Sequence, residues 1–102
     1  MNRVETLSKT FTGANTLKVV AGTNTPQGGD AGHGGVTVLE LRDEGGTCWH
    51  LVVEDNAGFI KRISDVKTIR LELFGDSEAA TFIGALKFAL KVFELQRESG
   101  NE

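Results

Sequence analysis

Apolar and polar side chains alternate along most of the first three quarters of the chain. Ile69, Leu71 and Leu73, for example, are separated by single charged residues. Alternation with a period of two places the apolar residues on one face of a β-strand. The pattern predicts five strands, over residues 4–12, 16–21, 36–42, 47–54 and 66–74, and leaves residues 59–63 undecided.

Turn-forming residues separate these segments. Gly13-Ala14-Asn15 lies between the first two predicted strands, and Asp43-Glu44-Gly45-Gly46 lies between the third and the fourth. Glycine with Asn or Asp between two alternating runs is typical of β-hairpins. We therefore expect a hairpin at each of these two positions.

A helical pattern replaces the alternation after Phe74. Asp76 or Ser77 can cap the first turn, and Glu78 complements the positive end of the helix dipole. The apolar spacing continues to about Arg97 and predicts one helix over residues 76–97. Strands followed by one helix indicate an α+β domain over residues 1–102. We expect an antiparallel sheet of about five strands, within residues 1–74, with this C-terminal helix packed on one face.

The predicted helix carries apolar side chains on two opposite sides. At 100° per residue, two stripes separate: one of Ala79, Phe82, Ile83, Leu86, Leu90 and Phe93, and one of Phe88, Val92 and Leu95. We name them the Ala79 stripe and the Phe88 stripe. A helix on a single sheet buries one stripe only. The other is covered by a loop, such as Phe59-Ile60, or by a second subunit, and the second option predicts a homo-oligomer.

Composition and charge narrow the class of function. With 39% hydrophobic and 25% charged residues, 102 residues make one ordinary soluble domain. A net charge of −3 argues against duplex DNA as a partner, because duplex binding needs many contacts from Lys and Arg to phosphates. One cysteine, Cys48, excludes an intrachain disulfide and favours the cytoplasm. We expect no signal peptide and no membrane span.

Glycine is concentrated in one segment, residues 22–35, which holds six of the thirteen glycines and the only proline. Glycine permits positive φ and close approach of a ligand to the backbone, and successive N–H groups can bind an anion. A fourteen-residue connection in so small a domain favours a function. The ligand-binding candidates in this segment are Asn24, Thr25, Gln27, Gly28, Gly29, Asp30, His33 and Gly34.

Three residues outside the loop complete the candidate ligand site. Arg42 and Arg70 lie on the polar face of the predicted sheet and could pair with a phosphate. Trp49 shares the alternation of Leu51 and Val53, which is typical of a core residue, although a tryptophan at a sheet edge can also stack on a base.

A metal site is the main alternative for the same segment. Asp30 and His33 could join Cys48 and His50, which are two residues apart on a predicted strand and share a face. The close-spaced Cys and His pairs of zinc sites are absent. We therefore expect no metal or other cofactor, and we rank a metal-dependent enzyme using Asp30, His33 and His50 second.

The loop Gly22-Thr23-Asn24-Thr25-Pro26-Gln27-Gly28-Gly29-Asp30-Ala31-Gly32-His33-Gly34-Gly35, together with Gly75-Asp76-Ser77-Glu78, resembles segments of small bacterial and phage proteins. In size, acidity and sheet-plus-helix outline the chain is also similar to phage sponge proteins. That resemblance implies tight binding, without cleavage, of cyclic or ADP-ribose-derived nucleotide immune signals. It also implies pockets between subunits and, for a phage protein, action in the host cytoplasm against defence.

The sequence thus favours non-enzymatic binding of a small anionic ligand, most plausibly a nucleotide, by a homo-oligomer. A structural or protein-interaction module, with helix and loop as assembly surfaces, is the third hypothesis.

Overall fold

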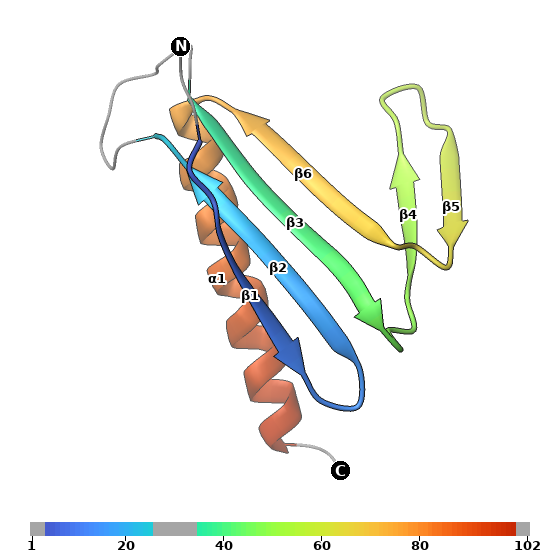
Figure 1. Cartoon of the computed structure of the whole chain (residues 1–102). Helices are drawn as coiled ribbons and strands as arrows, with labels where there is room; N and C mark the ends of the chain where they lie inside the picture. Colours follow the sequence, from blue (N-terminus) through green and yellow to red (C-terminus); the bar gives the residue numbers. More distant parts are fainter. Residues whose placement is uncertain (1–3, 26–34, 100–102) are drawn as a thin grey trace. The chain divides into compact units, whose positions relative to one another are not determined.

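The computed structural model describes residues 4–25 and 35–99 (Figure 1). In these two ranges the chain forms β1 (Leu7–Thr12), β2 (Thr16–Thr23), β3 (Val36–Gly45), β4 (His50–Glu54), β5 (Ile60–Ser64), β6 (Thr68–Phe74) and α1 (Asp76–Ser99). The predicted α+β class and the single C-terminal helix are confirmed. The undecided segment at residues 59–63 is strand β5.

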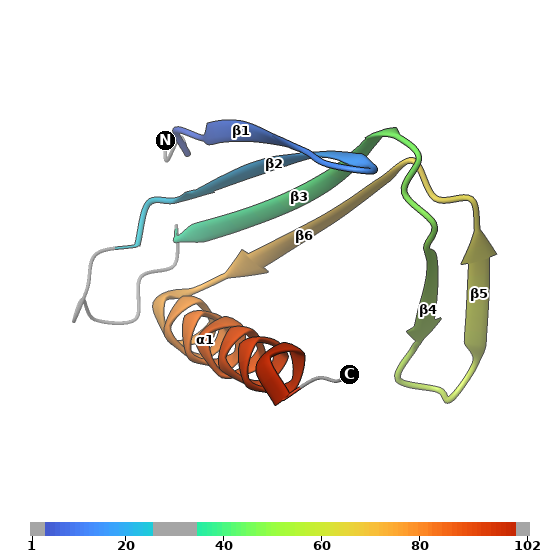
Figure 2. The same cartoon turned by 90° about the horizontal axis from the view of Figure 1, so that it is seen from below.

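The strands form two sheets instead of the one sheet of about five strands that we expected. A four-stranded sheet has the order β1-β2-β3-β6, and β4 and β5 form a separate two-stranded sheet (Figures 1 and 2). β1 and β2 pair antiparallel, with Phe11 opposite Leu17, so the predicted hairpin at residues 13–15 is confirmed. β4 and β5 also pair antiparallel, with Leu51 opposite Ile63.

The hairpin predicted at residues 43–46 is wrong, because β3 pairs with β2 and β6, and β4 pairs with β5. The carboxylate of Asp43 accepts hydrogen bonds from the amides of Gly45 (2.9 Å) and Thr47 (3.1 Å). Gly46 has a φ of 78°, a conformation that glycine adopts at little cost. These contacts shape a turn after which the chain leaves the sheet, so residues 46–49 are not part of a strand.

The chain divides into two compact units. One comprises residues 1–4, 23–37 and 73–102, and contains α1 with both ends of the glycine-rich loop. The other comprises residues 5–22 and 38–72. Packing of α1 on one face of the sheet depends on how one unit lies against the other, and it stays a prediction.

The buried core is small. Among the described residues, the buried apolar side chains are Val38, Val66 and Ala79, and the buried polar residue is Thr37. No helix in the described ranges has the length and apolar character required to cross a membrane.

Candidate functional site

Hydrogen bonds close the glycine-rich loop at its base. We define the loop base as residues 23–25 on one side and residues 35–37 on the other. The backbone N–H of Asn24 donates to the carbonyl of Val36 (3.2 Å). The side-chain Oδ1 of Asn24 accepts a hydrogen bond from the backbone N–H of Val36 (2.8 Å). The hydroxyl of Thr23 lies 2.7 Å from that of buried Thr37 and 3.1 Å from that of Thr25. The two ends of the loop are therefore held together by side chains as well as by backbone.

The loop base also touches the junction of β6 and α1. The amide of Gly75 donates to the carbonyl of Gly35 across 2.9 Å. A Cβ at Gly35 would lie 2.6 Å from Cγ2 of Thr25 and 2.9 Å from Oδ1 of Asp76. These distances are shorter than normal van der Waals contact, so a Cβ at position 35 would force the side chains of Thr25 and Asp76 to shift.

The predicted ligand residues of the loop divide into two groups. Asn24 and Thr25 belong to the loop base, where their side-chain oxygens take part in hydrogen bonds within the chain. The others lie outside the described residues: Gln27, Gly28, Gly29, Asp30, His33 and Gly34.

The two arginines proposed for a phosphate differ in their surroundings. Arg70 forms ion pairs with Glu72 (Nε to Oε2, 2.7 Å) and Glu40 (Nη1 to Oε1, 3.0 Å). The hydrogen bond that Arg70 donates to Glu72, followed by the one that it donates to Glu40, raises the pKa of Arg70 above its ordinary value. Arg42 is exposed on β3, six positions after Val36. A phosphate at Arg70 would have to compete with two carboxylates, which leaves Arg42 as the better candidate.

Trp49 is anchored by a hydrogen bond to the backbone. Its indole Nε1 donates to the carbonyl of Val66 across 2.6 Å, and Val66 is buried. Trp49 is half-buried and lies before β4. The bond links the segment before β4 to the segment after β5, which gives Trp49 a structural role like that of a core residue.

The alternative metal ligands are dispersed where the structure describes them. Cys48 is exposed and precedes β4, so it does not share a strand face with His50 as we expected. His50 Nε2 is in contact with Nη1 of Arg62 on β5. Asp30 and His33 lie outside the described residues. Within the described part of the chain, no group of three or more His, Cys, Asp or Glu residues could hold a metal ion.

The helix α1 shows apolar side chains on both predicted stripes. On the Ala79 stripe, Ala79 is 2% exposed and Phe82 is half-buried, whereas Ile83, Leu86, Leu90 and Phe93 are exposed. On the Phe88 stripe, Phe88 is 70% exposed, Val92 is half-buried and Leu95 is exposed.

An open pocket of about 400 Å³ lies beside the first turns of α1. Its walls are Leu73, Ser77, Glu78, Thr81, Phe82 and Ala85. Sequence analysis did not single out this pocket. The signal for it was the run of small side chains at Ser77, Thr81 and Ala85.

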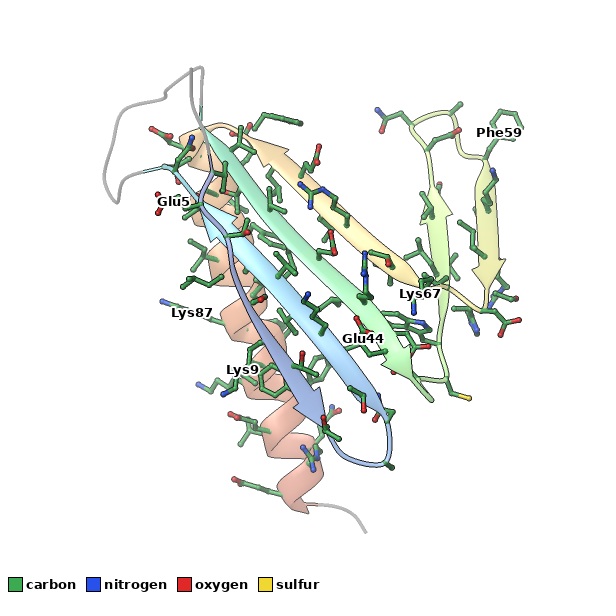
Figure 3. All side chains as sticks on the ribbon, viewed as in Figure 1. Glu5, Lys9, Glu44, Phe59, Lys67 and Lys87 are labelled. Atoms are coloured by element: carbon green, nitrogen blue, oxygen red, sulfur yellow. The ribbon has the colours of Figure 1, made fainter. Side chains whose placement is uncertain are left out.

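A second apolar surface lies on the β4–β5 hairpin. Register and alternation place Leu51, Val53, Ile63 and Phe59 on one face, together with Lys61, which lies opposite Val53. Phe59, at the turn between the two strands, is 74% exposed (Figure 3). A two-stranded sheet is at best marginally stable in water unless another element covers it.

Comparison with models of known protein families, with curated proteins and with solved structures finds no match.

Proposed function

We propose that this protein is a non-enzymatic binding module that associates with further copies of itself. The observation that carries the proposal is the exposure of large apolar side chains on two sides of α1. The argument for self-association depends on how much of each apolar side of α1 can be buried within one copy of the chain.

One helix cannot bury both of its apolar stripes against a single sheet. If the Ala79 stripe covers a face of the sheet, as the sequence predicts, Phe88 and Leu95 on the other stripe remain exposed, and Val92 is half-buried. Phe88 alone would then expose 70% of its surface, and Leu95 is also exposed. Monomeric soluble proteins rarely expose contiguous apolar patches of this kind, and such patches mark interaction sites.

The β4–β5 hairpin supports the same proposal independently of α1. Its apolar face carries Phe59 and Val53 in exposed positions. Two exposed apolar surfaces on different elements favour a protein that is completed by its neighbours in an assembly. The mixed charge of the chain, with 11 basic and 14 acidic residues, keeps the unassembled form soluble.

The test is the oligomeric state of the full chain. We expect light scattering and sedimentation velocity to give a dimer or larger assembly at micromolar concentration. Val92→Glu puts a charge into the Phe88 stripe and should yield monomers. Lys87→Glu, which changes an exposed side chain on the same helix but off both stripes, should leave the assembly intact (Figure 3). A monomeric unmutated protein overturns the proposal.

We also propose, as a second function, that the assembled protein holds a small anionic ligand at the glycine-rich loop in the cytoplasm. The supporting observation is that the loop base is fixed against the N-terminal end of α1, where the helix dipole favours negative charge. Asp76 and Glu78 in the first turn oppose this effect. An anion bound at this loop would therefore rely on backbone N–H groups of the loop. A nucleotide of the sponge-protein type meets these requirements.

Calorimetry with nucleotides and cyclic dinucleotides tests this second function. Gly34→Val adds a bulky side chain within the loop and should abolish binding, whereas the fold should survive, because the loop sequence contains few apolar side chains. Absence of any binder in a broad screen, or equal binding by the variant, contradicts ligand binding and leaves self-association standing.

A further inference from the structure

The strand β1 lies at one edge of the four-stranded sheet, and among the strands of the described ranges it pairs with β2 alone (Figure 1). All six residues of β1 are exposed. The backbone N–H and C=O groups along the outer side of an edge strand can pair with a strand of another chain. The outer side of β1 is therefore a candidate surface for a further strand.

One face of β1 combines apolar and charged side chains. Leu7 is 83% exposed, the largest exposed fraction of the large apolar side chains in the described ranges. Lys9 and Phe11 share its face by alternation, and the Nζ of Lys9 lies 5.1 Å from the centre of the Phe11 ring. Glu5 comes two residues before Leu7, and both Glu5 and Lys9 are exposed (Figure 3). Leu7 thus has a carboxylate two positions before it and an ammonium group two positions after it.

We infer that two copies of this chain pair edge to edge through β1, in antiparallel orientation, with a twofold axis at Leu7. The inference rests on the proposed self-association and names one of its interfaces. Leu7 then lies opposite Leu7 of the second copy. With β1 extended by two residues at its start, Glu5 of each copy lies opposite Lys9 of the other.

Charge selects this register. A symmetric antiparallel pair places one residue of β1 opposite its own copy. An axis at Lys9 would bring two ammonium groups face to face, which is unfavourable. An axis at Thr10 would place Lys9 opposite Phe11 and leave the carboxylate of Glu5 beyond the paired strands. Along β1, an axis at Leu7 alone pairs both charges and also places Leu7 against an apolar side chain.

Lys9 restricts the pairing of β1 and does not prevent it. A lysine in an edge strand normally opposes pairing with another chain. In the inferred register each ammonium group of Lys9 meets the carboxylate of Glu5, so that one register remains favourable while others are penalised. Such a device gives an edge strand one specific partner, a second copy of the same edge.

The edge pair is a supplementary contact within the assembly. Two short strands bury less surface than a stable dimer needs. We therefore expect this interface to act together with the exposed apolar surfaces of the proposed self-association. Its loss should lower the affinity of the assembly, and the strand pair by itself should not hold two copies together at micromolar concentration.

Cysteine cross-linking maps the register. In a Cys48→Ser background, Leu7→Cys should form a disulfide between two copies under oxidising conditions. Opposite residues of an antiparallel pair have Cα atoms about 4.5–5.5 Å apart, which is within the reach of a disulfide. Phe11→Cys, on the same strand and face, is the matched control. Its two copies would lie about 26 Å apart along the strands, at about 3.3 Å per residue, and should not cross-link.

Other patterns of cross-linking contradict the inference. Efficient cross-linking of Thr10→Cys in place of Leu7→Cys indicates the competing register. Equal cross-linking of Leu7→Cys and Phe11→Cys indicates random collision of exposed thiols, and either result overturns the pair at Leu7.

Exchange of charge tests the contact between positions 5 and 9. Lys9→Glu places two carboxylates opposite each other at both contacts, and Glu5→Lys places two ammonium groups there. Each single variant should raise the dissociation constant of the assembly by about tenfold. The double variant restores opposite charges and should recover most of the affinity. Lys87→Glu makes the same change of charge on α1 and should leave the affinity unchanged, whereas additive loss in the double variant contradicts the contact.

The outcomes separate the two proposals. An assembled protein in which Leu7→Cys does not cross-link overturns the edge pair alone. A protein that is monomeric before any substitution overturns both the edge pair and the proposed self-association. Circular dichroism of each variant establishes that a loss of affinity is not a loss of fold.

Discussion

Gly35 and Gly75 join the end of the glycine-rich loop to the start of α1, since the amide of Gly75 donates to the carbonyl of Gly35 at 2.9 Å. The close approach of these two backbones fixes where the loop ends relative to the first turn of the helix. A Cβ at Gly35 would also press on the side chains of Thr25 and Asp76.

Gly35→Ala should destabilise the protein by about 1–3 kcal/mol, the range for overpacking of a tight site. The added Cβ would lie 2.6 Å from Thr25 and 2.9 Å from Asp76. Urea unfolding measures the effect. The control is Gly13→Ala in the β1–β2 turn, where a Cβ would meet only the Asn15 carbonyl oxygen, at 4.0 Å. If both variants unfold like the unmutated chain, the loop base is not held as described.

Thr37→Val should lower the free energy of unfolding by about 1 kcal/mol, the value of an ordinary hydrogen bond. The buried hydroxyl of Thr37 lies 2.7 Å from that of Thr23, and valine keeps the shape but not the bond. Thermal and urea unfolding give the measurement. Thr10→Val on exposed β1 provides the comparison and should change stability by less than about 0.5 kcal/mol. Equal effects at the two positions would refute a special role for Thr37.

Asp43 should make the stability of the protein depend on pH in the acid range. Hydrogen bonds from the amides of Gly45 and Thr47 lower the pKa of Asp43 below its ordinary value of 3.8. A carboxyl with a lowered pKa stabilises the fold above the pKa that it has in the unfolded chain. That contribution is lost as pH falls through the lowered pKa of the folded state.

Asp43→Asn should therefore be less stable than the unmutated protein at neutral pH, and the difference should disappear in acid. Urea unfolding at a series of pH values shows the trend. Glu44→Gln, a change of the neighbouring exposed carboxylate, should leave the pH profile as it is (Figure 3). A difference that persists unchanged into acid would be inconsistent with the bonds of Asp43.

Trp49→Phe should destabilise the protein by about 1–3 kcal/mol, because the carbonyl of Val66 loses the indole donor at 2.6 Å. Trp49 is the only tryptophan, so its fluorescence reports its surroundings directly. We expect the emission of the unmutated protein to shift to longer wavelength on unfolding and to be insensitive to nucleotides. Strong quenching by a nucleotide would instead support base stacking on Trp49.

Local pattern was sufficient to predict α1 and the strands of the larger sheet, but it left β5 undecided. Alternation gave the four strands of the larger sheet, and the 3.6-residue period with Asp76 and Ser77 at its start gave α1. The local pattern was not sufficient to predict that β3 pairs with β6, because strand partners depend on contacts between residues far apart in the chain. The sequence around Asp43 predicted a hairpin turn between two paired strands. In the structure, the Asp43 carboxylate accepts hydrogen bonds from the amides of Gly45 and Thr47, in a turn after which the chain leaves the sheet.

Some features of the candidate site follow from the sequence, and others depend on the tertiary structure. The sequence alone determined that the glycines cluster in residues 22–35 and that α1 has two apolar stripes, since composition and helical period are properties of the chain itself. Tertiary structure decided that Asn24 and Thr25 close the loop base, that Arg70 is held by Glu40 and Glu72, and that a pocket lies beside Thr81 and Ala85. Asn24 lies far from Val36 in the chain, and Arg70 lies far from Glu40, so only folding brings these residues within hydrogen-bonding distance.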